Sequence, residues 1–171
     1  MKKVYIFDTS VLCCWLEIPG KEECGPEHDK WDHQRINRLV EDNENNGSTF
    51  VLPIATIIET GNHIAQAAGN KHPVATRLAH KMTMSANSET PWAAFENQSE
   101  LWTPKKLEEL AAKWPTLAVQ GIGIGDATIK DVAEYYARTG SVSVEILTGD
   151  QGLKAYQPAQ LIAPPQPRRR K

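Results

Sequence analysis

The strongest constraint in this sequence is a short apolar run near its start that ends in an aspartate. Val4–Phe7 is rich in β-branched and aromatic side chains, and Asp8 follows it directly. Such a run is typical of a strand buried on both faces of a sheet, which puts Asp8 at the carboxyl end of that strand. In open α/β sheets, ligands bind at this edge. Taken alone, Asp8 is better explained as the cap of a following helix.

Extended and helical patterns alternate along the rest of the chain. Thr49–Leu52 and Val142–Thr148 are further apolar runs typical of strands. This order predicts a parallel sheet with helices packed on it. We therefore expect an α/β fold, a three-layer α/β/α sandwich with a central, mainly parallel sheet. The expected helices span about 9–16, 33–44, 54–68, 72–84, 104–114, 126–139 and 151–156, and a last strand is expected at 160–163.

Length and composition fit one globular domain. The chain has 171 residues, of which 40% are hydrophobic and 23% are charged, and both values are ordinary for such a domain. We expect residues 1–163 to form it. Residues 164–171 are rich in proline and basic residues, which predicts a disordered tail that attracts phosphates regardless of sequence. The net charge of −2 gives no general attraction for nucleic acid, but cations can neutralise acidic residues at a nuclease site.

Cysteine content and hydropathy bear on location. The chain has three cysteines, and two of them are adjacent, which is a poor framework for disulfides and favours a reducing cytoplasm. Met1–Lys3 imitates the charged start of a signal peptide, but Asp8 interrupts the apolar run behind it. No apolar stretch approaches the ~18 residues that span a bilayer, so we expect no membrane segment.

Two segments show no clear periodicity. The polar residues 17–33, which contain several glycines and prolines, are expected to be an exposed loop. Cys24, His28 and His33 lie in it, but their spacing is not that of a zinc site. Residues 87–102 carry Trp92, Phe95 and Trp102, and we expect an irregular cover over the core rather than an aromatic platform for nucleobases.

Four acidic residues stand at comparable places in the expected fold. Asp8 and Asp150 follow strands, Asp126 is expected to open a helix, and Glu59 borders the apolar stripe of another. If the strands lie side by side, the four carboxylates converge at one sheet edge, where they would repel one another unless a cation is bound. Mg²⁺ or Mn²⁺ prefers such oxygen ligands, and paired metals cleave phosphodiesters. Local explanations compete: Asp126 as a helix cap, and Glu59 as a partner of His63.

The segments that carry these acids resemble the PIN-domain family of ribonucleases, which includes the toxins of many bacterial toxin–antitoxin pairs. The similar pieces are Ile6–Ser10, Thr56–Glu59, Gly125–Ile129 and Leu147–Asp150. Their order and spacing fit across nearly the whole chain. The resemblance implies the same sandwich fold, with a PIN-like nuclease domain at residues 1–163. It also implies endonucleolytic cleavage of RNA that depends on Mg²⁺ or Mn²⁺.

The resemblance also implies roles for individual residues and partners. Three carboxylates would be the main metal ligands, a fourth would support them, and two hydroxyls would orient them. The main ligands would be Asp8, Glu59 and Asp126, the supporting acid would be Asp150, and the orienting hydroxyls would be those of Ser10 and Thr148. RNA would be the substrate, and an antitoxin protein and a second copy of the chain are candidate partners.

Two other functions compete with this one. A phosphatase of the haloacid dehalogenase type also begins with a strand that ends in aspartate, and Asp126 with Asp131 imitates its later acids, although Ser10 replaces its second aspartate. On a helix, Asp131 lies about 140° around from Asp126, so we expect Asp131 to be solvated and away from any metal. The other alternative is a PIN-like module that binds RNA or protein without catalysis.

Overall fold

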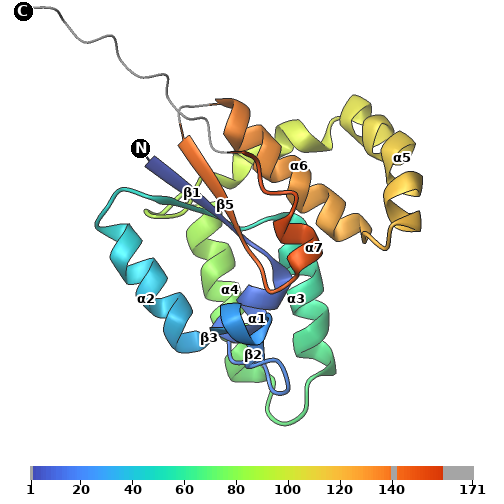
Figure 1. Ribbon diagram of the computed structural model, residues 1–171. Helices are drawn as coiled ribbons and strands as arrows, with labels where there is room; N and C mark the ends of the chain where they lie inside the picture. Colours follow the sequence, from blue (N-terminus) through green and yellow to red (C-terminus); the bar gives the residue numbers. More distant parts are fainter. Residues whose placement is uncertain (1, 140–141, 160–171) are drawn as a thin grey trace, which may run out of the picture.

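A parallel sheet lies at the centre of the protein, as the computed structural model shows for residues 2–139 and 142–159. The strands are β1 (Lys2–Phe7), β4 (Thr49–Val51) and β5 (Val142–Leu147), in the order β4-β1-β5 (Figure 1). β1 pairs Ile6 with Val51 on one side and with Ile146 on the other. The expected α/β class and parallel sheet are confirmed, while the strand expected at 160–163 and the basic tail lie outside the described residues.

The alternation of side chains along β1 builds two apolar cores, one on each face of the sheet. Tyr5 and Phe7 pack with one set of helices, and Val4 and Ile6 pack with the other, as the period of two along a strand requires. The first set is α1 (Thr9–Trp15), α2 (His33–Glu44), α3 (Ile54–Gln66) and α4 (His72–Ala86), and the second is α6 (Ile124–Thr139) and α7 (Gln151–Lys154). Helices therefore cover both faces of the sheet.

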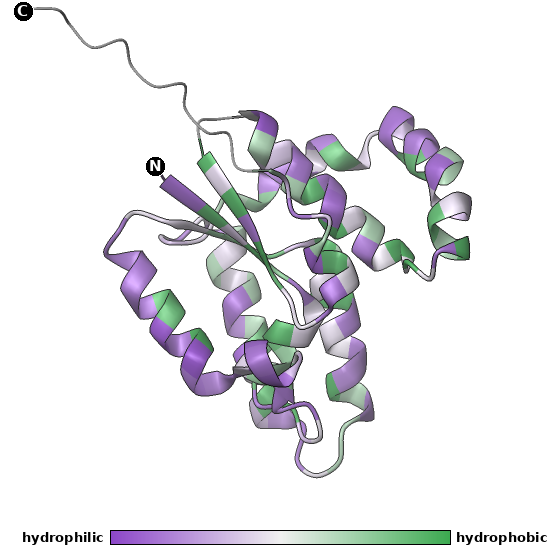
Figure 2. Cartoon of the chain, in the orientation of Figure 1, coloured by the Kyte–Doolittle hydropathy of each residue, from purple (hydrophilic) through white to green (hydrophobic). Residues whose placement is uncertain are grey.

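Local capping signals set the start of several helices. The carboxylate of Asp32 accepts a hydrogen bond from the Arg35 amide at the start of α2, as the sequence predicts. Thr103 does the same for Lys106 at the start of α5 (Pro104–Val119). Figure 2 shows α2 as mostly hydrophilic with few hydrophobic positions, which fits its single fully covered residue, Ile36.

Two helix boundaries differ from the prediction. α5 was expected to end near residue 114, but it continues through Pro115 to Val119. α6 begins at Ile124, so Asp126 lies inside its first turn rather than opening it. The glycines before Asp126 predict a later start for this helix, because glycine favours loops over helices.

The segment 17–33 is only partly the exposed loop that its composition predicts, because residues 19–22 are exposed and irregular but the rest forms local structure. It contains β2 (Glu23–Cys24), the single-turn helix η1 (Glu27–Asp29) and β3 (Trp31–Asp32), and β2 pairs antiparallel with β3. Ile18 and Trp31 are buried in the core, and the Arg35 guanidinium lies 3.7 Å from the centre of the Trp31 ring. Isolated apolar residues of this kind have no periodicity, so sequence patterns miss them.

The segment 87–102 covers the core, as expected. Its Trp92 packs against Phe7, Trp15 and Phe50. The Phe50 amide of β4 donates to the Pro91 carbonyl, and the Ala93 amide donates to the Phe50 carbonyl, which makes an isolated parallel bridge to the segment. The helix η2 (Phe95–Trp102) follows. No described helix has the length and apolar character needed to cross a membrane.

We predict that Trp92 is a large contributor to stability. Trp92 is 6% exposed, whereas Trp102, in the same segment, is 46% exposed. Trp92→Ala should lower the free energy of unfolding by about 3–5 kcal/mol, because it removes a buried ring and leaves a cavity. Trp102→Ala, the matched control, should cost clearly less. Urea unfolding of both variants measures these changes. Equal losses of unfolding free energy in the two variants would contradict the prediction for Trp92.

Candidate active site

Asp8 is a buried carboxylate that is fixed by hydrogen bonds from two elements. It is 5% exposed and caps α1, where its Oδ1 accepts a 2.6 Å bond from the Thr9 amide. Its Oδ2 accepts from the hydroxyls of Ser10 (2.6 Å) and Thr148 (2.7 Å). A buried charge needs such partners. Asp8 is therefore a helix cap, as the local alternative proposed, and it is also held rigidly at the sheet edge.

Ser10 and Thr148 connect Asp8 to the end of β5. The Ser10 hydroxyl accepts a 2.9 Å bond from the Gly149 amide, and the Thr148 hydroxyl accepts one of 2.9 Å from the Asp150 amide. Each hydroxyl therefore accepts from backbone and donates to the same carboxylate. Both hydroxyls predicted to orient the acids do contact one of them.

Glu59 reaches the same edge from α3. The Thr56 hydroxyl, one turn earlier on α3, donates a 2.7 Å bond to the Phe7 carbonyl and so ties the helix to the end of β1. The Glu59 Oε2 accepts a 2.7 Å bond from the Thr9 hydroxyl. Its Oε1 lies against Gly125 so closely that a Cβ there would clash. Only glycine lets the start of α6 approach this carboxylate without displacing it.

Asp126 lies in the first turn of α6 and faces the other acids. Burial and, after it, the charges of the other three carboxylates raise the pKa of Asp126 to about 6. The hydrogen bond that the Gly123 amide donates to the Asp126 carboxylate lowers this pKa, but its effect is smaller. The four predicted acids therefore lie close enough for their charges to interact, and they share one pocket.

Asp150 is the most exposed of the four acids. It caps the short helix α7, where its Oδ1 accepts from the amides of Gly152 (2.7 Å) and Leu153 (3.3 Å). Its neighbour Gly149 donates an amide hydrogen bond to Ser10 of α1, and in Figure 1 the end of β5 lies close to α1.

All four carboxylates line one open pocket of about 370 Å³. Side chains that the sequence did not single out for this site also line it, and several of them come from the segment 17–33. These added residues are Cys13, Lys21, Glu23, Cys24 and His63. The contribution of Lys21, Glu23 and Cys24 had no signal in the sequence, because the segment 17–33 folds against α1 through the buried residues Ile18 and Trp31.

The donor set of the pocket suits a hard divalent cation, which prefers carboxylate oxygens. In the part of the chain at 2–139 and 142–159, no group of three or more His, Cys, Asp and Glu side chains is arranged to hold a metal ion. The Asp8 and Glu59 carboxylates accept hydrogen bonds from hydroxyls, and the Asp150 carboxylate accepts them from helix amides. The chemistry fits, and binding would need the carboxylates to turn toward the cation.

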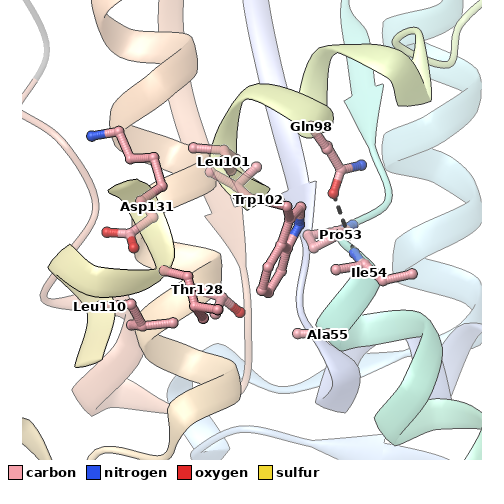
Figure 3. Close-up of a pocket in the computed structure, with 12 residues that line it drawn as sticks. Pro53, Ile54, Ala55, Gln98, Leu101, Trp102, Leu110, Thr128 and Asp131 are labelled. Carbon is pink, nitrogen blue, oxygen red and sulfur yellow. Dashed lines mark hydrogen bonds between the residues drawn. The ribbon is translucent and has the colours of Figure 1, made fainter. Parts of the chain in front are cut away.

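Asp131 lies elsewhere, between α5 and α6. It forms an ion pair with Lys113 of α5, and it lines the hollow of Figure 3 beside Leu110 and Thr128 rather than the acidic pocket. Asp131 was expected to be solvated and away from any metal; the structure places it outside the acidic pocket, but partly covered and paired with Lys113 rather than solvated. This removes from the acidic pocket the residue on which the phosphatase alternative depends.

Figure 3 also shows the hydrogen bond between Gln98 and Ile54 beside this second hollow. The Gln98 amide, buried in η2, accepts a 3.2 Å bond from the Ile54 amide and donates one of 2.9 Å to the Leu52 carbonyl. These bonds satisfy backbone groups where the chain passes from β4 to α3, and they hold η2 over that junction.

Comparison of the chain with protein-family models, with curated proteins and with solved structures finds no match.

We predict that Gly125 sets the position of Glu59. Gly125→Ala should force the Glu59 carboxylate away and weaken Mn²⁺ binding by about 10-fold or more, since residues that position ligands typically contribute that much. Stability should change little, because the displaced atoms end a flexible side chain. Calorimetric titration with Mn²⁺ measures the affinity.

The matched control is Gly61→Ala, on α3, where an added Cβ meets nothing within 4 Å. It should leave Mn²⁺ binding unchanged and stabilise the helix by about 0.5–1 kcal/mol. Unchanged Mn²⁺ affinity in Gly125→Ala would contradict the role given to Gly125.

Proposed function

We propose that this protein is a PIN-like endoribonuclease that uses Mg²⁺ or Mn²⁺ to hydrolyse RNA phosphodiester bonds. The observation that carries the proposal is the gathering of Asp8, Glu59, Asp126 and Asp150 around one open pocket at the carboxyl edge of a parallel sheet. A cluster of acids that raises the pKa of one of its own members is costly for a fold. Such costs are found where a site needs the charge.

The four carboxylates would hold the cation, with Asp8 as the most rigid of them. When bound, the cation supplies positive charge to the scissile phosphate and acidifies a water for attack. Ser10 and Thr148 keep the Asp8 carboxylate in one orientation. Thr9 does the same for Glu59, so these hydroxyls position the acids without reaching the substrate themselves.

Lys21 is proposed to hold the RNA backbone at this pocket. Of the described residues that line the pocket, it is the one with a permanent positive charge. Its ammonium group lies close enough to Cys13 to lower the pKa of that thiol against the larger effect of burial. A cation at the rim of an acidic pocket attracts phosphate where the acids alone would repel it.

A protein partner of the antitoxin kind is part of the same proposal. An apolar groove of about 260 Å³ begins at Glu59 and Gly125 and continues between α3, η2 and α5. Large apolar side chains that are exposed to solvent line it: Ile58, Trp102, Leu107 and Ile124. Exposed apolar patches of this kind mark protein contacts, and a partner or a second copy seated there would lie beside the acids.

We predict that Asp126→Asn abolishes activity without harming the fold. RNA cleavage with Mn²⁺ should fall by about 100-fold or more, because a ligand charge is lost. In chelator at pH 7 the variant should be more stable than the wild type, since the amide removes the repulsion among the acids. Cleavage of assorted RNAs, with Mn²⁺ and with chelator, and thermal unfolding provide the two measurements.

The matched control is Asp131→Asn, on the same helix. It should cleave RNA at nearly the wild-type rate and lose at most about 1 kcal/mol of stability with its partly exposed ion pair. Wild-type cleavage by Asp126→Asn, or equal loss of activity in both variants, would rule out the proposed site.

We predict that Lys21→Met weakens RNA binding more than it slows cleavage. KM should rise several-fold with kcat nearly unchanged, and the effect should shrink as salt is added, because the contact acts through phosphate charge. Lys71→Met, an exposed lysine between α3 and α4 that does not line the pocket, is the control. A loss confined to kcat would show that Lys21 does not act by holding the substrate.

A further inference from the structure

The three cysteines of the chain lie together at the wall of the acidic pocket. Cys13 and Cys14 are on α1, and Cys24 is on β2, which packs against α1. All three are free thiols. Cys13 and Cys24 both line the pocket. Cys13 and Cys14 are only 1% and 0% exposed, whereas Cys24 is partly exposed. Cys24 is therefore the thiol best placed to react with a molecule that enters the pocket.

Cys24 touches the parts of the chain that carry the acids. A Cβ at Gly149 would lie 2.8 Å from its sulfur, so β2 packs directly on the residue before Asp150. Its side chain also interacts with the Ser10 hydroxyl, which itself bonds Asp8. A chemical change at Cys24 would therefore alter the surroundings of Asp8 and Asp150.

Cys14 is the direct neighbour of Cys24, and the two thiols are not equivalent. The hydrogen bond that Cys14 makes to Cys24, with burial as the second cause, raises the pKa of Cys14. The same bond lowers the pKa of Cys24. Burial raises the pKa of Cys13 to about 11. Cys24 is partly exposed and packs against the core cluster that contains the fully buried Cys14. A partly exposed thiol beside a buried one is the arrangement of an attacking and a resolving cysteine.

We propose that Cys24 is an oxidation site for hydrogen peroxide, and that Cys14 resolves the oxidised form as a disulfide. This inference does not rest on the proposed nuclease function. The Cys24 thiolate attacks one peroxide oxygen, the O–O bond breaks, and a sulfenic acid forms while hydroxide leaves and is protonated to water. The Cys14 sulfur then attacks the Cys24 sulfur, the S–O bond breaks, and the departing hydroxide takes the Cys14 proton.

The electrons balance in this sequence. Two thiols lose two electrons in total, and one peroxide is reduced to two waters. The product ties β2 to α1 at the floor of the pocket and removes the sulfur from its contact with Ser10. Oxidation would therefore alter the wall of the pocket next to Asp8 and Asp150.

The test uses the reduced full-length chain, hydrogen peroxide and peptide mass spectrometry after alkylation. The Cys13→Ser variant, which retains the proposed pair, should form an intramolecular disulfide that lowers the mass by about 2 Da and is reversed by dithiothreitol. The matched Cys14→Ala variant should form no disulfide, and its Cys24 should remain a sulfenic acid that dimedone captures.

A second measurement keeps the proposal testable if Cys14→Ala does not fold. Brief treatment of the folded wild type with iodoacetamide at neutral pH should label Cys24 about 10-fold or more faster than either cysteine of α1. The proposal is overturned if Cys13 forms the disulfide instead, if Cys24 is labelled no faster than the buried pair, or if peroxide leaves Cys13→Ser unchanged. None of these results depends on whether the protein cleaves RNA.

Discussion

The arrangement of the whole site depends on one buried charge, the Asp8 carboxylate. A charge removed from water costs several kcal/mol unless hydrogen bonds replace the lost solvent. Here the donors come from the first turn of α1 and from Thr148 after β5, so β1, α1 and β5 must meet at one point. Thr56 adds α3 to this meeting point through the carbonyl of Phe7. The requirement to satisfy these polar groups aligns the elements that carry Asp8, Glu59 and Asp150, whereas α6, which carries Asp126, is placed by its packing on the other face of the sheet.

The gathering of acids opposes folding, and apolar packing on both faces of the sheet has to outweigh it. One face is closed by the aromatic group of Phe7, Trp15, Phe50 and Trp92, whose ring centres lie 5.0–6.3 Å apart where they touch. The other face is closed by α6, whose first turn also carries Asp126. The same helix thus supplies both core and charge. This arrangement is expected where function requires a group that stability disfavours.

Signals that lie within a few residues of one another predicted much of the fold. The apolar run before Asp8, the caps Asp32 and Thr103, and the strand before Asp150 are all of this kind. The failures share a different cause. Residues 17–33 fold because Ile18 and Trp31 find places in a core built by distant segments, and no local pattern records such a partner. The continuation of α5 through Pro115 likewise has no local signal, since proline inside a helix is normally unfavourable.

The sequence by itself determined the alternation of strands and helices, and therefore that acids which follow strands end at one edge of a parallel sheet. This holds because strand direction and side-chain period are local properties. Only the tertiary structure decided that Glu59 lies against Gly125, that Asp131 pairs with Lys113 instead of joining the acids, and that Cys24 reaches Cys14. These contacts join residues that are distant along the chain. They follow from how the elements pack, because close packing, not local pattern, selects which side chains meet.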